Sequence, residues 1–367
     1  MGIKVVSTVV ALTLGAGGLF LYFNKETAPS KESSVVSNDA VATESTTTGV
    51  LPVPVQKMLE GGDHVWQTFN NCSSTGLLIA MSFFGIHDTQ EAIAEATRPW
   101  NNLKGDNDDK SVTLFELAKY AKEKHGLVTY VRADGDIELL KKFIANDIPV
   151  VARALMYPDK DYVHYRVIKG YDESKKIVIE SDSIEGKTVP YSYDAWMHLW
   201  KDFNYSYLIV VPESKKALVE QILSESLDET VAWKNAKAQA ESDLVKNPND
   251  TRAHFNLTTA LYYLGDYELA VREFEKIESS LQPHVLWFQH EPIQAYFKLG
   301  KYDRVIELSD KVINANNKAV SELYVLKGKM YQSKGDTASA KLEFEKAIYY
   351  NKHLIEAREA YTGVGGI

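Results

Sequence analysis

The 367-residue sequence predicts an α+β domain followed by an all-helical repeat array, with an apolar membrane span at the N-terminus. Three observations predict this organisation. Residues 57–213 change from a helical spacing of apolar residues to the alternation typical of strands, residues 229–360 repeat a glycine every 35 residues, and residues 5–23 carry no charge. We therefore expect four regions: an anchor (1–23), a disordered linker (24–56), the α+β domain (57–213) and the repeat domain (214–367).

Composition excludes several classes of partner and cofactor. The net charge of −9 argues against a surface that binds nucleic acid phosphates. The single cysteine excludes an intramolecular disulfide and the zinc sites built from several cysteines. The stretch KGDNDDK at 104–110 lacks the glycine and the terminal glutamate of a calcium loop. We therefore expect neither a metal nor a cofactor.

The N-terminal apolar run is VVSTVVALTLGAGGLFLYF, nineteen residues at 5–23. This length is just enough to cross a bilayer core, which needs about 20 residues. The following LFLYFNK offers no small-residue cleavage site, and Lys4 before the run favours an N-terminus in the cytoplasm. We expect a single-pass membrane anchor with the rest of the chain extracytoplasmic. Secretion after signal cleavage is the alternative.

The linker and the first half of the α+β domain differ in periodicity. Residues 24–56 are rich in Ser and Thr and have no sustained period, so we expect them to stay disordered. After them, an apolar helical face is formed by Leu77, Leu78, Met81 and Phe84. Ser73 and Ser74 stand where an N-cap belongs, and Gly85 stops the run. Two more helices are expected at 88–97 and 111–124.

The second half of the domain favours strands. Apolar β-forming residues alternate along segments that we expect to form an antiparallel sheet: 127–133, 148–155, 164–172, 175–182 and 206–211. A helical lobe followed by a sheet lobe is the architecture that this order predicts.

Cys72, in the stretch NNCSSTG, is the only cysteine of the chain and stands at the predicted helix start. A lone cysteine beside an apolar stretch is often buried and inert. The first turn of a helix, however, favours a thiolate through its unpaired N–H groups and its dipole. A nucleophilic cysteine also needs a base and a group that orients the base.

The hairpin HYRVIKGYDESKKIVIESD supplies such a pair. His164 and Asp182 are equidistant from residue 173, inside the predicted turn, so the pattern predicts that they face each other across two antiparallel strands. Glu180 shares the face and is the reserve candidate. A one-residue bulge would change this register, and a His–Asp pair of this kind can also be purely structural.

The order Cys, His, Asp resembles that of papain-like cysteine peptidases, and more narrowly that of the bacteriocin-processing (double-glycine) group, cysteine peptidase family thirty-nine. That group carries a Gln before the Cys, a Gly thirteen residues after it, a His-x-x-Val-x-x-Gly-Tyr-Asp segment and an acidic residue after the next strand. Matching positions here are Gln67, Cys72, Gly85, His164, Val167, Gly170, Tyr171, Asp172 and Asp182. YDAWMHLW at 193–200 resembles the group's late aromatic helix.

The resemblance implies a role for four residues. Cys72 would be the nucleophile, His164 the base, Asp182 the group that fixes the imidazole, and Gln67 a donor to the oxyanion. The chain departs from the group in having Ser73-Ser74 where Gly-Pro follows the cysteine, and Ser183 where Pro follows the acidic residue. Loss of activity with retention of the fold is therefore an open alternative.

The C-terminal third repeats a helical hairpin. Gly265, Gly300 and Gly335 recur every 35 residues, followed by Ala270, Val305 and Ala340 and then by Phe274, Ser309 and Phe344. This pattern over about 229–360 resembles tetratricopeptide repeats, in which the glycine turns the hairpin and the small residue allows close packing. The resemblance implies a groove for a protein partner, while an array that only dimerises or caps the neighbouring domain is the alternative.

Together these features predict a membrane-anchored extracytoplasmic cysteine peptidase that acts on peptide or protein substrates and recruits a protein partner through its repeats. Two alternatives stay open. One is a catalytically inactive scaffold that acts through the repeats. The other is a transglutaminase-like acyltransferase, which uses the same triad with an amine acceptor.

Overall fold

The computed structural model describes residues 49–99, 112–158, 160–282, 284–315 and 318–366. The described residues from 49 to 366 belong to one compact unit. The predicted anchor at 5–23, most of the predicted linker and the stretch 104–110 lie outside the described residues. No helix in the described part of the chain combines the length and the apolar character that a membrane span requires.

One antiparallel sheet organises the first domain. Within the described ranges it has seven strands, in the order β2-β7-β3-β4-β5-β6, and β1 pairs with β4. The strands are β1 (Gln56–Met58), β2 (Val128–Arg132), β3 (Val150–Leu155), β4 (Val163–Asp172), β5 (Ile177–Asp182), β6 (Gly186–Ser192) and β7 (Tyr207–Val211). Alternating apolar residues predicted five of these strands, because side chains of an antiparallel sheet alternate between its two faces.

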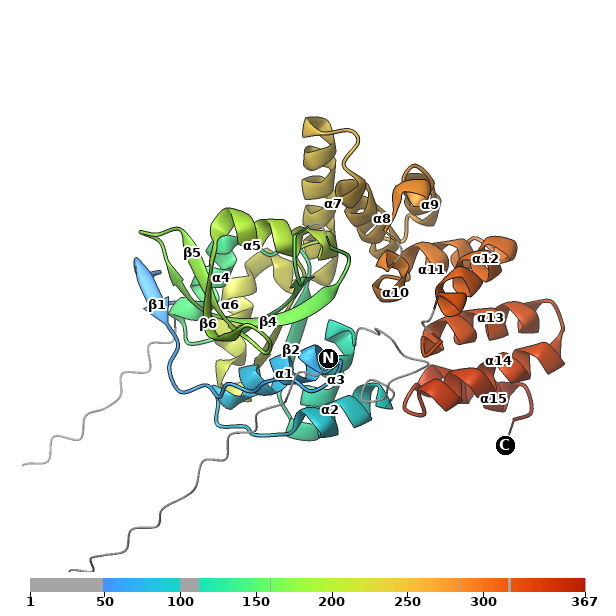
Figure 1. Cartoon of the computed structure of the whole chain (residues 1–367), viewed down its shortest axis with the longest axis horizontal. Helices are drawn as coiled ribbons and strands as arrows, with labels where there is room; N and C mark the ends of the chain where they lie inside the picture. Colours follow the sequence, from blue (N-terminus) through green and yellow to red (C-terminus); the bar gives the residue numbers. More distant parts are fainter. Residues whose placement is uncertain (1–48, 100–111, 159, 283, 316–317, 367) are drawn as a thin grey trace, which may run out of the picture. The chain divides into compact units, whose positions relative to one another are not determined.

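Five helices of the described domain accompany the sheet: α1 (Cys72–Ser82), α2 (Gln90–Thr97), α3 (Leu114–His125), α4 (Ile137–Ala145) and α5 (Tyr193–Trp200). Helix α1 packs against β3 and β4, and α1, α2 and α3 lie together in Figure 1. The mixed α/β class is confirmed. The division into a helical lobe and a sheet lobe is less strict than predicted. In chain order, α4 occurs between β2 and β3, and α5 occurs between β6 and β7.

The start of α1 corrects a sequence prediction. The N-cap is Asn71, and Cys72 is already helical, so Ser73 and Ser74 lie inside the first turn with buried side chains. Helix α1 ends at Ser82, and Gly85 follows with a left-handed φ of +69°. The cap prediction was wrong by two residues because any small polar side chain in this run fits the cap pattern equally well.

The end of the predicted linker contacts the domain. The backbone N–H of Leu51 donates to Asn146 Oδ1 at 2.9 Å, and Tyr171 donates to the carbonyl of Pro54 at 2.8 Å. Strand β1 then runs close to Gly170 of β4, where an added Cβ would lie 2.9 Å from the Met58 sulfur. Glycine at 170 thus allows β1 to approach β4.

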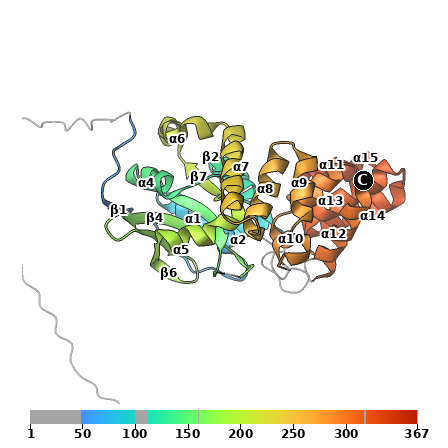
Figure 2. The same ribbon diagram turned by 90° about the horizontal axis from the view of Figure 1, so that it is seen from above.

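The helical array follows the sheet domain. Its helices are α6 (Lys216–Leu223), α7 (Glu229–Lys246), α8 (Thr251–Tyr263), α9 (Tyr267–Glu275), α10 (Val285–Phe288), α11 (Glu291–Lys298), α12 (Tyr302–Asn314), α13 (Ser321–Ser333), α14 (Thr337–Tyr350) and α15 (Ile355–Gly363). Helices α8 to α15 succeed one another in chain order (Figures 1 and 2). Short 3₁₀ helices occur at Lys201–Phe203, Glu213–Lys215, Ser224–Leu227 and Glu278–Ser280.

The three repeat glycines turn helical hairpins as predicted. Gly265, Gly300 and Gly335 have φ values of +81°, +68° and +77° between the paired helices α8–α9, α11–α12 and α13–α14. Only glycine adopts this left-handed backbone without steric cost. The small or branched residues five positions later are fully buried, at Ala270, Val305 and Ala340. The repeat prediction is therefore confirmed by backbone geometry and by packing.

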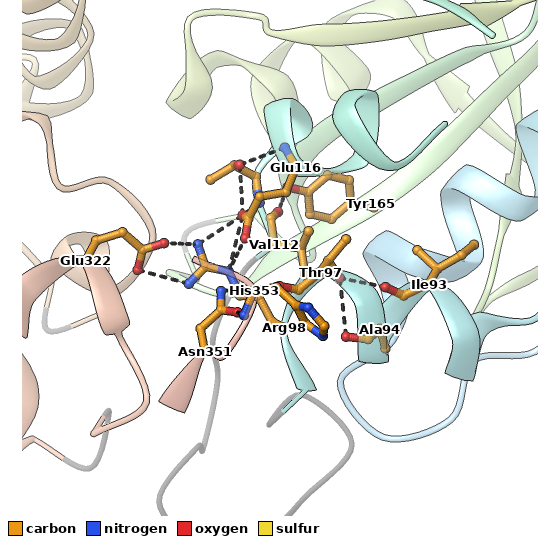
Figure 3. Close-up of polar contacts among 11 residues, drawn as sticks. Ile93, Ala94, Thr97, Arg98, Val112, Glu116, Tyr165, Glu322, Asn351 and His353 are labelled. Atoms are coloured by element: carbon orange, nitrogen blue, oxygen red, sulfur yellow. Dashed lines mark hydrogen bonds and ion pairs between the residues drawn. The ribbon is translucent and has the colours of Figure 1, made fainter. Parts of the chain in front are cut away.

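A buried arginine connects the sheet domain to the repeats. Arg98, which follows α2, donates to Glu116 of α3 from Nε and from one terminal nitrogen, each at 2.9 Å. It also pairs with Glu322 of α13 at 2.6 Å (Figure 3). Arg98 is only 3% exposed. This three-residue group is called the Arg98 clamp below.

Candidate functional site

Cys72 lies at the first residue of α1 and is half-buried. The first helical hydrogen bond runs from the N–H of Thr75 to the carbonyl of Asn71, at 2.8 Å. The N–H groups of the first turn precede this ladder and have no helical partner of their own. The thiol therefore lies in the positive field of a helix N-terminus, the environment that favours a thiolate.

One pocket of about 360 Å³ brings together three of the four predicted site residues. Gln67, Cys72 and His164 all line it. They come from the loop before α1, from the start of α1 and from β4. The fourth residue, Asp182, lies behind His164 at the end of β5.

His164 contacts Asp182, but through a different register from the predicted one. The Nε2 of His164 donates to Oδ2 of Asp182 at 2.9 Å. Asp182 is paired with Arg166, not with His164, and a bulge shifts the ladder between Ile168 and Gly170. The contact survives because His164 and Arg166 point to the same face of β4, so the carboxylate reaches the imidazole diagonally. The predicted register was wrong because the innermost pair is Asp172 and Ile177, so the turn is centred between residues 174 and 175 and not at residue 173. The bulge then moves the ladder by one residue.

Hydrogen bonds hold Asp182 in its charged form. The side chain is fully buried. Burial alone raises its pKa, but the His164 hydrogen bond and charge, with the N–H groups of Glu185 and Ile184, outweigh burial and hold the pKa well below its usual range. These two N–H groups donate to Oδ1 at 2.8 and 2.7 Å. Asp182 is thus a fixed anion that orients the imidazole.

Arg166 and Glu180 extend this pair into a buried charged cluster. Arg166 Nε lies 3.1 Å from Asp182 Oδ2 and 3.0 Å from Glu180 Oε1, and both Arg166 and Glu180 are fully buried. Burial raises the pKa of Glu180 well above its ordinary value, and the positive Arg166 counteracts this only in part. One guanidinium charge balances one carboxylate, so the anion is Asp182. Glu180, the reserve candidate, pairs with Arg166 and does not replace Asp182.

Gln67 is oriented by Ser183. The Ser183 hydroxyl donates to the side-chain oxygen Oε1 of Gln67 at 2.7 Å. The backbone N–H of Gln67 donates to the backbone carbonyl of Ser183 at 3.0 Å. Because the amide oxygen is engaged with Ser183, the amide NH₂ is directed to the other side. A serine at 183, where the resembled group has proline, therefore fixes which amide atom Gln67 can offer to a ligand in the pocket.

The Gly-Tyr-Asp segment that follows His164 is structural. Gly170 makes room for β1, Tyr171 bonds to the chain before β1, and Asp172 accepts from the N–H and hydroxyl of Ser174 in the hairpin turn. None of the three lines the pocket of Cys72. The spacing of this segment therefore reflects the geometry of the hairpin that carries His164.

Sequence reasoning missed several residues of the site. Arg166 lies two positions after His164 on the same strand face, and that spacing was a usable signal. His284 and Trp287 also line the pocket, although they belong to the repeat array. Their sequence distance from Cys72 gives no signal of this contact.

Within the described residues, one group of carboxylates has a spacing that would suit a metal ion. Its members are Glu180, Asp182 and Glu185. Arg166 already occupies this cluster through its two ion pairs. A cation there would have to compete with the guanidinium.

Comparisons with known proteins agree with the two-part architecture. Residues 50–213 match the Peptidase_C39 like family, and residues 321–353 match a tetratricopeptide repeat. The chain therefore combines a C39-like peptidase domain with tetratricopeptide repeats, as the sequence resemblance implied. No curated protein matches the chain.

Three solved structures are similar to parts of this chain. A C39-like peptidase from Bacillus anthracis is 15% identical, with 43% of this chain and 98% of that chain covered and a TM-score of 0.36. The peptidase domain of Streptococcus ComA, a bi-functional ABC transporter involved in quorum sensing, is 17% identical, with 42% and 99% covered and a TM-score of 0.33. MamA from Desulfovibrio magneticus RS-1 is 17% identical, with 40% and 92% covered and a TM-score of 0.31.

Proposed function

We propose that this protein is a membrane-anchored extracytoplasmic cysteine peptidase. The observation that carries the proposal is the pocket that joins Cys72 at a helix start, Gln67, and a His164 whose far nitrogen is bonded to Asp182. The anchor is proposed from the apolar run at 5–23, and the repeats are proposed to recruit a protein partner.

In the proposed reaction, the Cys72 thiolate attacks the carbonyl carbon of a substrate peptide bond, and the carbonyl oxygen becomes an oxyanion. Gln67 donates its NH₂ to this oxyanion beside the N–H of Cys72. His164 uses Nε2 to hold Asp182, so Nδ1 remains to exchange the proton with the thiol. Protonated His164 then gives this proton to the leaving amine, and a thioester remains.

Water completes the proposed cycle. His164 takes a proton from a water molecule, the resulting hydroxide attacks the thioester carbon, and the C–S bond breaks to release the acid product and the thiolate. Asp182 keeps the imidazole in one orientation in both halves, because its negative charge stabilises the imidazolium form.

An inactive scaffold is the second candidate, and one observation favours it. Ser73 directly follows Cys72 and lines the same pocket, at a position where the resembled peptidases have glycine. A side chain there narrows the approach of a substrate backbone. The protein would then act through its repeats alone.

Digestion of a random peptide library by the full chain, read by mass spectrometry, tests the proposal, with Cys72→Ala as the control. We expect products from the wild type only, and hydroxylamine should intercept the thioester as a peptide hydroxamate. Products that also form with Cys72→Ala would contradict the triad. Transfer to added amines in preference to water would favour the acyltransferase alternative, and an intact library would favour the scaffold.

A further inference from the structure

The repeat array supplies part of the wall of the catalytic pocket. His284 and Trp287 line the pocket that contains Cys72 and His164. Trp287 belongs to α10, and His284 is the residue at its N-cap. Helix α10 is a short helix between α9 and α11, so it stands outside the regular succession of repeat hairpins.

Contacts from the peptidase domain fix α10 at both ends. Oδ2 of Asp161 accepts from the backbone N–H of His284 at 2.9 Å and lies 2.7 Å from its Nδ1. Tyr162 stacks on the His284 ring with centroids 5.5 Å apart. At the other end, Arg153 of β3 donates to the carbonyl of Phe288 at 2.7 Å. Asp161 and Tyr162 directly precede β4, which carries His164, so one segment positions both the base and α10.

Trp287 is a wall residue with an unpartnered donor. Its side chain is 5% exposed, and its ring meets the His284 ring edge-on with centroids 4.2 Å apart. Among the described residues, its buried Nε1–H has no hydrogen-bond partner. A buried N–H without a partner is unfavourable, because nothing replaces the hydrogen bond that it makes to water. A backbone carbonyl of a peptide in the pocket is an acceptor that would satisfy it.

The rest of the pocket indicates what kind of side chain it accepts. Apolar side chains of Met156, Val163 and Ile184 line it together with Trp287, on a wall that also carries the polar side chains of Gln67, Asn70 and Ser73. No Asp, Glu, Lys or Arg occurs among its described lining residues. Burial of a charged substrate side chain there is unfavourable, because no charged lining residue other than Cys72, His164 and His284 is available to compensate the lost hydration.

We propose that α10 makes Trp287 and His284 specificity-determining residues of the peptidase, forming a subsite for an uncharged, apolar residue next to the scissile bond. In this arrangement Trp287 Nε1 donates to a backbone carbonyl of the substrate. The inference rests on the proposed function, because it assigns the substrate class of the same pocket.

Two alkylating probes on the full chain test the subsite. Iodoacetamide reports the reactivity of Cys72 alone, whereas a leucyl chloromethyl ketone must also bind through the neighbouring residue. In each case the thiolate forms a C–S bond and a halide leaves. We expect Trp287→Phe, which removes the N–H and keeps a ring, to lower the chloromethyl ketone rate about tenfold relative to the iodoacetamide rate, the loss of one hydrogen bond.

Trp196→Phe is the matched control. Trp196 of α5 is fully buried, and its Nε1 also has no partner in the described part of the chain, but it does not line the pocket. We expect it to leave the ratio of the two rates unchanged. We also expect an aspartyl chloromethyl ketone to react at least tenfold more slowly than the leucyl reagent with the wild type. If Trp287→Phe does not fold, Asp161→Asn loosens α10 from outside the pocket and should lower the same ratio.

The outcomes separate this inference from the proposed function. A Cys72 that reacts with neither probe removes the peptidase proposal and the subsite with it. A reactive Cys72 with the same ratio in Trp287→Phe and wild type overturns the subsite alone. Equal acceleration of both probes in Trp287→Phe also overturns it, because α10 would then only cover the thiol.

Discussion

Two buried arginines of this protein stand between pairs of carboxylates. Arg98 lies between Glu116 and Glu322, and joins the peptidase domain to the repeats. Arg166 lies between Glu180 and Asp182, directly behind His164. Arg98 is 3% exposed and Arg166 is fully buried. The two groups therefore have similar composition and similarly buried guanidinium groups, but Glu116 and Glu322 are 24% and 23% exposed, whereas Glu180 and Asp182 are fully buried.

Their hydrogen bonding differs. Each carboxylate of the Arg98 clamp receives two donors from the guanidinium (Figure 3). In the Arg166 cluster, one oxygen of Asp182 is shared between Arg166 and His164, while Glu180 has an ion pair but no hydrogen bond within the described residues. In the clamp, both carboxylates are bound by the guanidinium and serve the structure. In the Arg166 cluster, the Asp182 anion also binds the His164 imidazole and can therefore serve catalysis.

Loss of the His164 imidazole should have the largest effect on activity. A small effect would mean that the Asp182 anion does not act through His164. We expect His164→Ala to lower kcat on the order of 10⁴-fold or more, because the members of a catalytic triad act as a unit. The strand backbone is unaffected, so the far-ultraviolet circular dichroism should stay the same. Peptide turnover of the full chain measures this effect. Activity within tenfold of wild type would show that His164 is not the base.

Removal of Arg98 should cost stability and little else. We expect Arg98→Met to lower the free energy of unfolding by about 3 kcal/mol, because the buried guanidinium is removed and two carboxylates lose its charge-assisted hydrogen bonds. Arg304→Met is the matched control. Arg304 also pairs with two carboxylates, Glu278 and Glu307, but it is 30% exposed.

For the control we expect a change below about 1 kcal/mol, the range of exposed ion pairs. Denaturant unfolding measures both variants. Equal losses for Arg98→Met and Arg304→Met would contradict the view that burial sets the cost of breaking the clamp.

Ser183 should have an intermediate effect on catalysis. We expect Ser183→Ala to lower kcat about tenfold with KM nearly unchanged, because Gln67 keeps its amide but loses the hydrogen bond that orients it. Gln67→Ala should cost about 10²–10³-fold. In a double-mutant cycle, adding Ser183→Ala to Gln67→Ala should change nothing further. Additive losses would mean that Ser183 does not act through Gln67.

Glu180 should give the smallest effect, seen in the pH dependence of stability. Its pKa in the folded protein is raised above the ordinary value of 4.5, so the folded state holds a proton that the unfolded state releases. Wild-type stability should therefore fall as the pH rises above about 4.5, and Glu180→Gln should remove this loss.

We expect the free energy of unfolding of the wild type to fall relative to that of Glu180→Gln as the pH rises above about 4.5, by at most about 1.4 kcal/mol per pH unit. Glu185→Gln, which changes an exposed neighbouring carboxylate, should keep the wild-type slope. Parallel pH profiles of wild type and Glu180→Gln would contradict a protonated Glu180.

The sequence was informative wherever structure is local. Helical spacing and the recurring glycines predicted the repeat hairpins, since the left-handed turn at Gly265 depends on neighbouring residues alone. The place of Cys72 near the start of α1, though not the cap residue, and the contact of His164 with Asp182 could also be predicted, because a helix start and a hairpin are local elements.

The rest could not be predicted, for two physical reasons. The exact turn position and small irregularities set the register without a clear sequence signal, as the turn centred between residues 174 and 175 and the bulge after Ile168 do. Contacts between distant segments depend on packing, so the pairing of Arg98 with Glu322, 224 residues apart, and the insertion of α10 beside Cys72 have no local signature. Strand β6 was missed because its short segment lacks a strong period, whereas α4 has a clear helical period and an Asp136 N-cap that would have predicted it.

The most direct measurement for the central claim is the rate of Cys72 alkylation by iodoacetamide as a function of pH, in wild type and in His164→Ala. We expect the pH midpoint of the wild-type alkylation rate to lie well below about 8.5, the ordinary pKa of a thiol, because the helix start and the imidazole both favour the thiolate. In His164→Ala the midpoint should move up toward that value. A wild-type profile that follows an ordinary thiol, unchanged by His164→Ala, would contradict the account.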